Sequence, residues 1–445
     1  MGFPRAFVWG AATSAFQIEG GRIDGKGQSI WDTFSDQGRL NDRADIACDH
    51  YHRWPADVAL MKALGLDAYR MSIAWTRVMP EGTGAVNQKG FDFYKRLIDG
   101  VLEAGITPWV TLHHWDLPQA LQDRGGWADR STVDAFVAYA EVVATALGDR
   151  VSHWITQNEP WVAAVLGYID GVFAPGISDW HSGLMAGHHI LLSHGQAIPA
   201  IRALSKDAQV GIALDCRPNV PASPNPEDVE ASIHADGYRN RWFFDPVFGQ
   251  GYPEDMVSRY QDMGRINGLD WIHAGDLEAI STPIDFLGVN YYTSVAIKAG
   301  EEEGEHPGVA PGPNPPEGFT EMGWAVTPAA LTELLRRIRH EYWKGPIYIT
   351  ENGASYSDGP GEDGSIHDTR RIDYVRAHLG ALEEAIDEGI PVDGYFHWSL
   401  LDNLEWLAGF SQRFGLIHVD QETLVRTPKA SFDWYRGVIA RNGLE

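Results

Sequence analysis

Glu351 stands at a position where a carboxylate could do chemistry. It closes the run "PIYITE" (346–351), which is rich in apolar and β-branched residues, and Asn352 and Gly353 follow it. A near-continuous apolar run predicts a strand buried on both faces, and Asn-Gly predicts a turn. We therefore expect Glu351 at the carboxyl end of a buried strand, which favours a catalytic acid over a structural one.

Glu159 closes a similar run, "HWITQNE" (153–159). Two carboxylates on facing walls fit glycoside hydrolysis, in which a protonated acid assists the leaving oxygen and an ionised acid attacks the anomeric carbon. Asn158 can hydrogen-bond a sugar hydroxyl beside the acid, and Arg70 and Tyr292 are suited to hold Glu351 as an anion. This chemistry requires a fold that brings the two glutamates together.

Short apolar runs recur eight times along the chain, with amphipathic helical patterns such as 91–105 and 132–148 between them. Strands that alternate with helices imply parallel pairing, and eight units predict a closed (β/α)8 barrel. A doubly wound open sheet is the alternative, but no G-x-G-x-x-G or P-loop follows the first run. The predicted strands begin at Phe7, Ala68, Thr107, His153, Gln209, Asp285, Pro346 and Val392.

The long connections support the barrel, because those at 215–230, 294–326 and 354–368 all follow predicted strands. In a barrel the loops from strand to helix build the active-site face, so we expect 294–326 to be a rim loop. No shift in composition marks a boundary, and we expect one domain over residues 1–445.

Polar side chains stand at or just beyond most of the predicted strand ends. One alternative is that each only satisfies backbone groups at the rim, but convergence from so many strands favours an active site. The set is Gln17, Arg70, His113, His114, Asn158, Glu159, Asn290, Tyr292, Glu351, His397 and Trp398, with Asp402, Glu405 and Trp406 just beyond.

Five segments in order resemble glycoside hydrolase family 1, the β-glucosidase family, and the resemblance extends over essentially the whole chain. The "TQNEP" segment (156–160) resembles the acid/base motif of that family, and "ITENG" (349–353) resembles its nucleophile motif. The others are "FVWGAATSAFQIEG" (7–20), "TLHHWDLP" (111–118) and "HWSLLDNLEW" (397–406).

The resemblance implies a retaining exo-β-glycosidase, with Glu159 as general acid/base and Glu351 as nucleophile, their carboxyls about 5–5.5 Å apart. Burial and the anion of Glu351 should raise the pKa of Glu159, while Arg70 and Tyr292 should keep the pKa of Glu351 low. The remaining implied roles are hydroxyl binding by Gln17, His114, Asn158, Glu405 and Trp406, stacking under the sugar by Trp398, a place near the nucleophile for Asn290 and Tyr292, and a leaving-group contact by Trp324.

The chain lacks the characteristic residues of two branches of the family, and this narrows the expected substrates. Glu159 is not replaced by Gln as in the family's plant thioglucosidases, and Ser411 and Gln412 stand where the phospho-sugar branch is expected to carry a cation. We therefore expect an unphosphorylated glucosyl, galactosyl or fucosyl group. A transglycosidase with the same site, a non-catalytic sugar-binding barrel and a barrel enzyme of other chemistry, such as an isomerase, remain as alternatives.

The composition limits the partners. Sixty-one acidic residues against 35 basic ones give a net charge of −26, which disfavours nucleic acid and anionic membranes. Two cysteines, no 18-residue apolar run and no signal-peptide pattern fit a cytoplasmic protein. We expect small β-glycosides or oligosaccharides, including those of cellulose degradation, as substrates of a monomer or homo-oligomer that needs no cofactor.

Two segments could bind a metal. The first holds His181, His188, His189 and His194, and the second is "EEEGEH" (301–306). Neither contains a recognised ligand motif, so structural packing is expected for the first and a solvated loop tip for the second.

Overall fold

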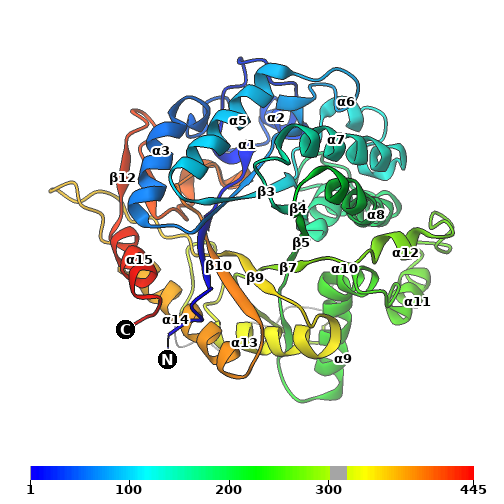
Figure 1. Ribbon diagram of the computed structural model, residues 1–445. Coiled ribbons are helices and arrows are strands. Elements are labelled where there is room, and N and C mark those ends of the chain that lie inside the picture. The colour runs from blue at the N-terminus through cyan, green and yellow to red at the C-terminus, as the bar shows by residue number, and fades with distance from the viewer. Residues whose placement is uncertain (1, 301–317) are drawn as a thin grey trace.

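Eight parallel strands form a closed barrel in the computed structural model of the protein, which describes residues 2–300 and 318–445 (Figure 1). The strands are the apolar, β-branched runs of the sequence, and most of their residues are buried because helices cover the outside. They are β1 (Val8–Ala12), β2 (Ala68–Ser72), β3 (Thr107–His113), β4 (His153–Asn158), β5 (Gln209–Asp215), β7 (Phe286–Asn290), β9 (Ile347–Asn352) and β10 (Val392–Trp398).

The spatial order of the barrel strands follows their order in the chain and closes between β10 and β1. Closure is set by the register in which Val8 of β1 lies opposite Gly394 of β10. The predicted (β/α)8 barrel is therefore confirmed, and the open doubly wound alternative is wrong because the sheet has no free edge.

Helices surround the barrel as an outer ring (Figure 1). The longer ones are α3 (His50–Leu64), α5 (Gln88–Glu103), α7 (Ser131–Leu147), α8 (Trp180–Leu204), α9 (Pro226–Asp236), α11 (Glu254–Asp262), α13 (Pro328–Arg337), α14 (Thr369–Asp387) and α15 (Ala430–Arg441). The shorter ones are α1 (Ala15–Ile18), α2 (Ile30–Asp36), α4 (Trp75–Val78), α6 (Gln119–Gln122), α10 (Trp242–Val247) and α12 (Asp276–Ile280).

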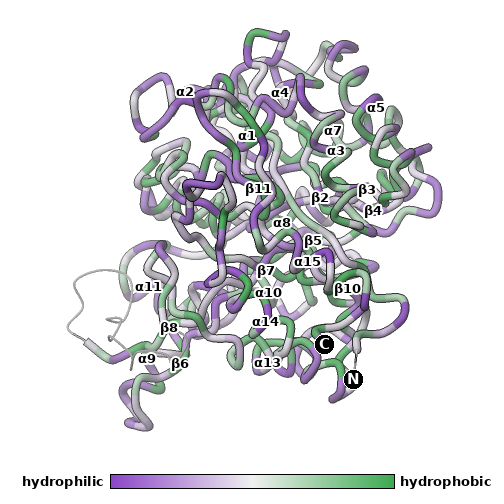
Figure 2. Tube along the Cα trace, turned by 90° about the vertical axis from the view of Figure 1, so that its left-hand side faces the viewer, coloured by the Kyte–Doolittle hydropathy of each residue, from purple (hydrophilic) through white to green (hydrophobic). Residues whose placement is uncertain are grey.

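Helix α5 shows why these segments fold onto the sheet. Phe91, Tyr94, Leu97, Ile98 and Val101 are all buried, and their spacing of three and four residues places them on one face. Hydrophilic stretches lie mainly on the loops and outer helix faces (Figure 2). The amphipathic patterns at 91–105 and 132–148 correspond to α5 and α7, as predicted.

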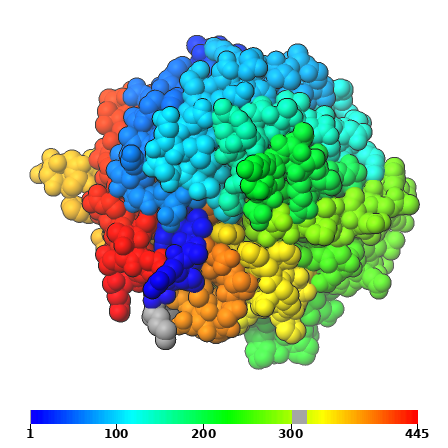
Figure 3. Space-filling view, viewed as in Figure 1, coloured from blue at the N-terminus to red at the C-terminus, as the bar shows by residue number. Residues whose placement is uncertain are grey.

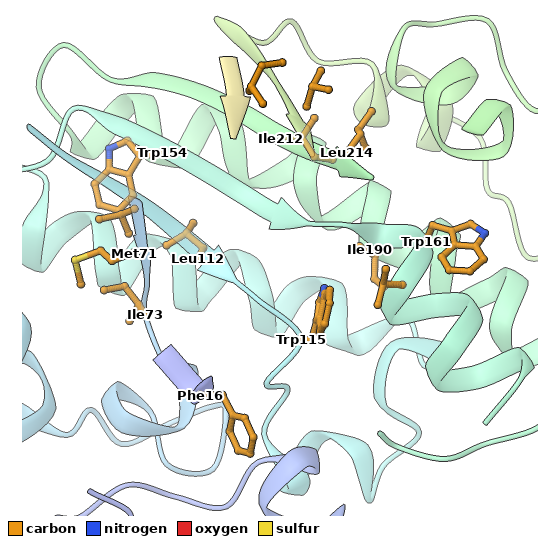
Figure 4. Packing of buried hydrophobic residues seen from close by; sticks show 14 of the residues in the cluster. Phe16, Met71, Ile73, Leu112, Trp115, Trp154, Trp161, Ile190, Ile212 and Leu214 are labelled. Carbon is orange, nitrogen blue, oxygen red and sulfur yellow. The ribbon is translucent and has the colours of Figure 1, made fainter. Parts of the chain in front are cut away.

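Two apolar layers hold the barrel. Trp109 fills the inside, with its ring 4.9 Å from Phe286 and 5.1 Å from Phe396 between centroids. Residues of the opposite strand face, such as Leu112 and Trp154, pack outward against the helices (Figure 4). The alternation of side chains along each strand produces both layers from the same sequence.

The sequence predicts a first strand over the whole apolar run "FVWGAATSAFQ" (7–17), and its predicted end at Gln17 is wrong. Strand β1 ends at Ala12, and Gln17 lies in helix α1, which begins at Ala15. The main-chain N–H of Ala15 donates to Ser72 Oγ at 2.7 Å, and this bond draws the chain from the barrel rim into the helix.

Short elements in the long loops were also not predicted. The connection at 215–230 holds β6 (Asn219–Pro221), which pairs with β8 (Val295–Ile297), and β11 (Ile417–Val419) pairs with β12 (Arg426–Pro428). Short 3-10 helices occur at η1 (Gly126–Ala128) and η5 (Trp406–Ser411). Short π-helices occur at η2 (Val162–Ile169), η3 (Gly237–Arg241) and η4 (Ile338–Tyr342). The acidic run at 301–306 and most of the predicted rim loop lie outside the described residues.

The two ends of the chain lie side by side (Figures 1 and 3). The side-chain amide of Asn442 donates to the carbonyl of Phe3 at 2.7 Å and accepts from Trp9 Nε1 at 2.9 Å. Helix α15 thereby covers the outside of β1. Among the described residues, no helix combines the length and apolar character that crossing a membrane demands.

Candidate active site

Glu351 lies at the carboxyl end of β9, opposite Asn290 of the neighbouring strand β7. Its Oε1 accepts from Arg70 Nη1 at 2.6 Å, and its Oε2 accepts from the hydroxyl of Tyr292 at 2.6 Å. Both carboxylate oxygens are therefore held, one by a buried cation and one by a phenol.

Glu159 follows β4 directly and has a backbone φ of 48°. A left-handed conformation is unfavourable for a residue with a side chain, and such strain is concentrated at functional sites. The Glu159 N–H donates to the carbonyl of Ala213 at 2.9 Å, which fixes this turn against β5. Its Oε1 accepts from Asn290 Nδ2 at 2.7 Å. Among the described residues, no cation makes an ion pair with it.

A chain of hydrogen bonds joins the two glutamates. Asn290 Nδ2, which contacts Glu159, also donates to Asn158 Oδ1 at 3.0 Å, and Arg70 Nη2 donates to the same oxygen at 2.5 Å. Arg70 then contacts Glu351. Because every link is buried, the network fixes the position of one acid relative to the other.

Both glutamates line one cavity of about 360 Å³ at the carboxyl ends of the strands. Of the other residues predicted for the site, His114, Tyr292, Trp324, Trp398, Glu405 and Trp406 also line it. Gln17, Arg70, Asn158 and Asn290 are buried and hydrogen-bonded to lining residues or to one another. These residues and the two glutamates are thus brought to one place. The other three strand-end residues predicted from the sequence do not line the cavity: His113 contacts Gln157, His397 contacts the carbonyl of Phe414, and Asp402 pairs with Lys429.

The pKa of Glu159 lies well above its ordinary value. Burial is the largest cause, and the nearby anions of Asp215 and Glu351 add to it, against the hydrogen bond from Asn290. The arrangement therefore favours a protonated Glu159, which can donate a proton at neutral pH.

The expectation of a low pKa for Glu351 is wrong in direction. Burial raises the pKa of Glu351 above its ordinary value, while the cation of Arg70 and the hydrogen bond from Tyr292 oppose the rise. Arg70 makes an ion pair with Glu351, whereas no cation in the described part of the chain pairs with Glu159, so these contacts favour the anion on Glu351 and the proton on Glu159.

Glu405 and Gln17 form a second polar contact at the cavity. Gln17 Nε2 donates to the carbonyl of Leu404 at 2.9 Å and lies 3.4 Å from Glu405 Oε2. Burial and the anion of Glu351 raise the pKa of Glu405 to about 8, although Gln17 opposes the shift. Glu405 can therefore present a hydroxyl as well as a carbonyl to a ligand near neutral pH.

Aromatic side chains make up much of the cavity wall. The ring of His114 lies nearly parallel to those of Trp398 and Trp406, at 5.7 and 6.1 Å between centroids. Trp324 packs against Tyr292 at 5.3 Å. Burial lowers the pKa of His114 well below its usual value, so it is a neutral imidazole in the described site. Flat apolar faces beside polar groups suit the faces and hydroxyls of a sugar.

Sequence reasoning missed several lining residues. Asp215 ends β5, so the strand-end rule could have found it, and Trp161 lies two residues beyond Glu159. Arg217 and Arg239 line the same part of the cavity, but only the packing of η3 reveals the latter.

No group of three or more His, Cys, Asp or Glu side chains in the described residues could hold a metal ion. The histidines of α8 instead have packing partners. His188 contacts Tyr252 and Asp276, His189 contacts the carbonyl of Trp127, and His194 contacts Thr156.

A closed parallel barrel with paired, buried glutamates at its strand ends defines the glycosidase class of barrel enzymes. A family model described as "Glycosyl hydrolase family 1" matches residues 1–444. The chain belongs to this family.

Curated relatives match over almost their full length. Beta-glucosidase A of Acetivibrio thermocellus is 46% identical over 447 residues, covering 99% of both chains. The bifunctional beta-D-glucosidase/beta-D-fucosidase of Bifidobacterium breve is 43% identical and covers 98% of both. Among solved structures, the beta-glucosidase of Thermotoga maritima in complex with glucoimidazole superposes with a TM-score of 0.94 at 44% identity, over 100% of both chains.

Proposed function

We propose that the protein is a retaining, exo-acting β-glucosidase that removes terminal nonreducing β-D-glucosyl groups by double displacement. The observation that carries this proposal is the pair Glu159 and Glu351, which line one cavity, differ in their charge partners and are joined by one hydrogen-bond network. The family membership and the names of the relatives agree with it. We propose that residues 1–445 act as a single catalytic domain.

In the first step, Glu351 attacks the anomeric carbon and the bond from that carbon to the leaving oxygen breaks. Glu159 transfers its proton to this oxygen, so the leaving group departs neutral. A glycosyl ester of Glu351 remains. Arg70 and Tyr292 hold the carboxylate ready for attack and limit its protonation.

In the second step, Glu159 acts as the base. Esterification removes the negative charge of Glu351, which is one of the causes of the raised pKa of Glu159. Glu159 can then take a proton from water, which attacks the anomeric carbon and releases both the sugar and Glu351. Two inversions at this carbon give net retention, a mechanism that requires two carboxyls about 5–5.5 Å apart.

The sugar would lie against the aromatic wall, with Trp398 beneath it and hydroxyl contacts from Gln17, His114, Asn158, Glu405 and Trp406. Asn290 and Tyr292 would lie near the reacting carbon, and Trp324 near the leaving group. The relative from B. breve is named for fucosidase as well as glucosidase activity, so fucosides and galactosides belong in the substrate panel.

The proposed biological setting is the hydrolysis of unphosphorylated β-glycosides or short oligosaccharides, including those from cellulose. Gln412, which stands where a phosphate would require a cation, accepts instead from Ser355 at 2.7 Å. Both cysteines are free and buried, which fits a reducing compartment such as the cytoplasm.

Two single variants test the assignment of the acids. Glu351→Ala should abolish turnover of both activated and poor leaving groups, because the attacking group is gone. Glu159→Ala should spare 4-nitrophenyl β-glucoside relative to cellobiose, whose leaving oxygen needs the proton, by about 10²–10⁴ in the ratio of kcat/KM. Stopped assays of glucose release measure both.

A control separates this result from loss of fold. Gln88→Ala changes an exposed residue of α5 that bonds Asp92, and it should leave the substrate ratio unchanged. Equal losses of Glu159→Ala on both substrates would contradict its role as the acid, and an α-anomer as the first product by NMR would exclude retention.

A further inference from the structure

Three cavity-lining residues to which the proposed reaction assigns no substrate contact stand at or just beyond the carboxyl end of β5. They are Asp215, Cys216 and Arg217. In the barrel order, β5 lies opposite β1 and next to β4, which carries Glu159. The proposed hydroxyl contacts Gln17 and Glu405 follow β1 and β10, on the far side. A leaving group protonated by Glu159 would therefore extend over the end of β5.

Most charges in this region are compensated. Arg239 makes an ion pair with Asp215, and its guanidinium lies 3.4 Å from the ring centroid of Trp161. Glu351 is paired with Arg70. Within the described part of the chain, Arg217 has no carboxylate in ion-pair range, and its side chain makes no hydrogen bond.

The side chain of Arg217 is nevertheless partly buried. Its Nε is buried without a hydrogen-bond partner. Its main chain is fixed at both polar atoms, since the N–H donates to Asn240 Oδ1 at 3.2 Å and the carbonyl accepts from Asn240 Nδ2 at 3.0 Å. These two bonds therefore fix the backbone position from which the Arg217 side chain extends at the cavity wall.

A partly buried guanidinium without an ion-pair partner is stabilised when an anion binds to it. Burial, with the nearby cation of Arg239, lowers the pKa of Arg217 to about 9, which still leaves it charged at neutral pH. A carboxylate bound there would regain the lost solvation through charge-assisted hydrogen bonds, which a guanidinium can make in pairs.

The rest of this cavity wall is apolar and flat. Trp161 and Phe173 line it together with Val162 and Leu166 of η2. Trp161 projects from the segment that follows β4 (Figure 4). These side chains can pack against an aromatic leaving group, which needs no hydrogen bonds from this part of the wall, as well as against a second sugar.

We propose that the leaving-group end of the cavity selects aryl β-glucosides whose aromatic ring carries a carboxylate, with Arg217 as the residue that binds this carboxylate. This inference rests on the proposed β-glucosidase activity and names a substrate class for it.

The test compares two substrates that differ mainly in charge, the β-glucosides of 4-hydroxybenzoate and 4-hydroxybenzamide. The wild type should favour the carboxylate by about tenfold to hundredfold in kcat/KM, the range for a hydrogen bond to a charged group, chiefly through KM. Because the contact is electrostatic, added salt should reduce this preference.

Variants assign the preference to one side chain. Arg217→Gln should abolish the preference while leaving the amide substrate within about twofold. Arg217→Lys should retain part of it, since the charge remains but the paired geometry does not. Arg376→Gln is the matched control, because the side chain of Arg376 is exposed on α14 and pairs with Asp373.

The outcomes separate the two proposals. Turnover of 4-nitrophenyl β-glucoside with no preference for the carboxylate in the wild type overturns the inference alone. The inference alone is also overturned if Arg217→Gln lowers kcat/KM for cellobiose more than kcat/KM for the carboxylate substrate. Failure to hydrolyse any of these β-glucosides overturns the proposed function and the inference together. If Arg217→Gln does not fold, Arg217→Lys and the salt dependence of the wild type decide.

Discussion

Glu159 and Glu351 are both buried carboxylates, and their immediate contacts set them apart. The carboxylate of Glu351 accepts from a guanidinium and a phenol hydroxyl, whereas the carboxylate of Glu159 accepts, within the described residues, only from the amide of Asn290. The proposed activity requires Glu351 ionised and Glu159 protonated, so the rate should fall at low pH as Glu351 gains a proton and at high pH as Glu159 loses one.

Tyr292→Phe tests whether protonation of Glu351 sets the fall in kcat/KM at low pH, the acidic limb of the pH profile. The hydroxyl of Tyr292 lowers the pKa of Glu351, so its removal should raise that pKa and move the acidic limb of kcat/KM to higher pH. Tyr291→Phe is the control, because the neighbouring hydroxyl bonds Thr327 and not Glu351. An acidic limb that stays in place in Tyr292→Phe, or moves equally in both variants, would contradict the assignment.

The sequence predicts single residues well where a simple rule applies. Apolar runs that end in a polar residue identify Glu159 and Glu351, and the structure places both at the same cavity. The pKa of Glu351 was not predictable in direction, because burial and Arg70 act in opposite senses and only coordinates give their balance. The contact of Arg239 with Asp215 likewise joins two segments whose packing has no sequence signal.

At the level of elements, the ends of β9 and β10 approach each other closely beyond Glu351. A Cβ built on Gly353 would lie 1.8 Å from the carbonyl oxygen of Trp398, which is main chain and cannot rotate away. This glycine lets two strand ends meet, and those ends carry Glu351 and Trp398.

Gly353→Ala should therefore push the two strand ends apart. We expect a loss of about 1–3 kcal/mol of unfolding free energy, as for overpacking, together with reduced kcat/KM. Thermal unfolding and glucose-release assays measure the two effects. Gly380→Ala in α14 is the matched control, since nothing lies within 4 Å of its added Cβ, and it should be neutral or stabilising. Equal behaviour of the two variants would show that the close approach is relieved without cost.

Periodicity explains which elements could be predicted. The barrel strands and helices such as α5 repeat their apolar residues often enough to be recognised. Strands of three residues, such as β6 and β11, are too short to show a period. The apolar residues of α1 continue the first apolar run, so the sequence predicts them as part of the first strand. Tertiary contacts, such as that of Ala15 with Ser72, decide these cases.

At the level of the whole molecule, the alternation of eight runs with helices predicts the closed barrel, since parallel neighbours must be joined by crossovers. It does not predict how the chain ends meet. Asn442 has a φ of 51°, and its side chain bridges Phe3 and Trp9. This contact lies beyond the last strand, where no repeat provides a signal.

Asn442→Ala should lower the midpoint of thermal unfolding while leaving kcat/KM at 25 °C unchanged. The variant loses three side-chain hydrogen bonds, to Phe3, Pro4 and Trp9, worth about 0.5–1.5 kcal/mol each, and places alanine in a left-handed conformation. Asn442→Gly loses the same bonds without that backbone cost and should be affected less. Equal midpoints for wild type and Asn442→Ala would show that the bridge does not support the fold.

The meeting of the two ends has a consequence for how the barrel could be rebuilt. Because Phe3 and Asn442 are already hydrogen-bonded, a short peptide could join the termini, and new ends could be opened in an exposed turn such as that at Gly364. Such a circularly permuted chain would keep every strand neighbour of the native barrel. The order in which the eight units are synthesised is then separable from the architecture that they build.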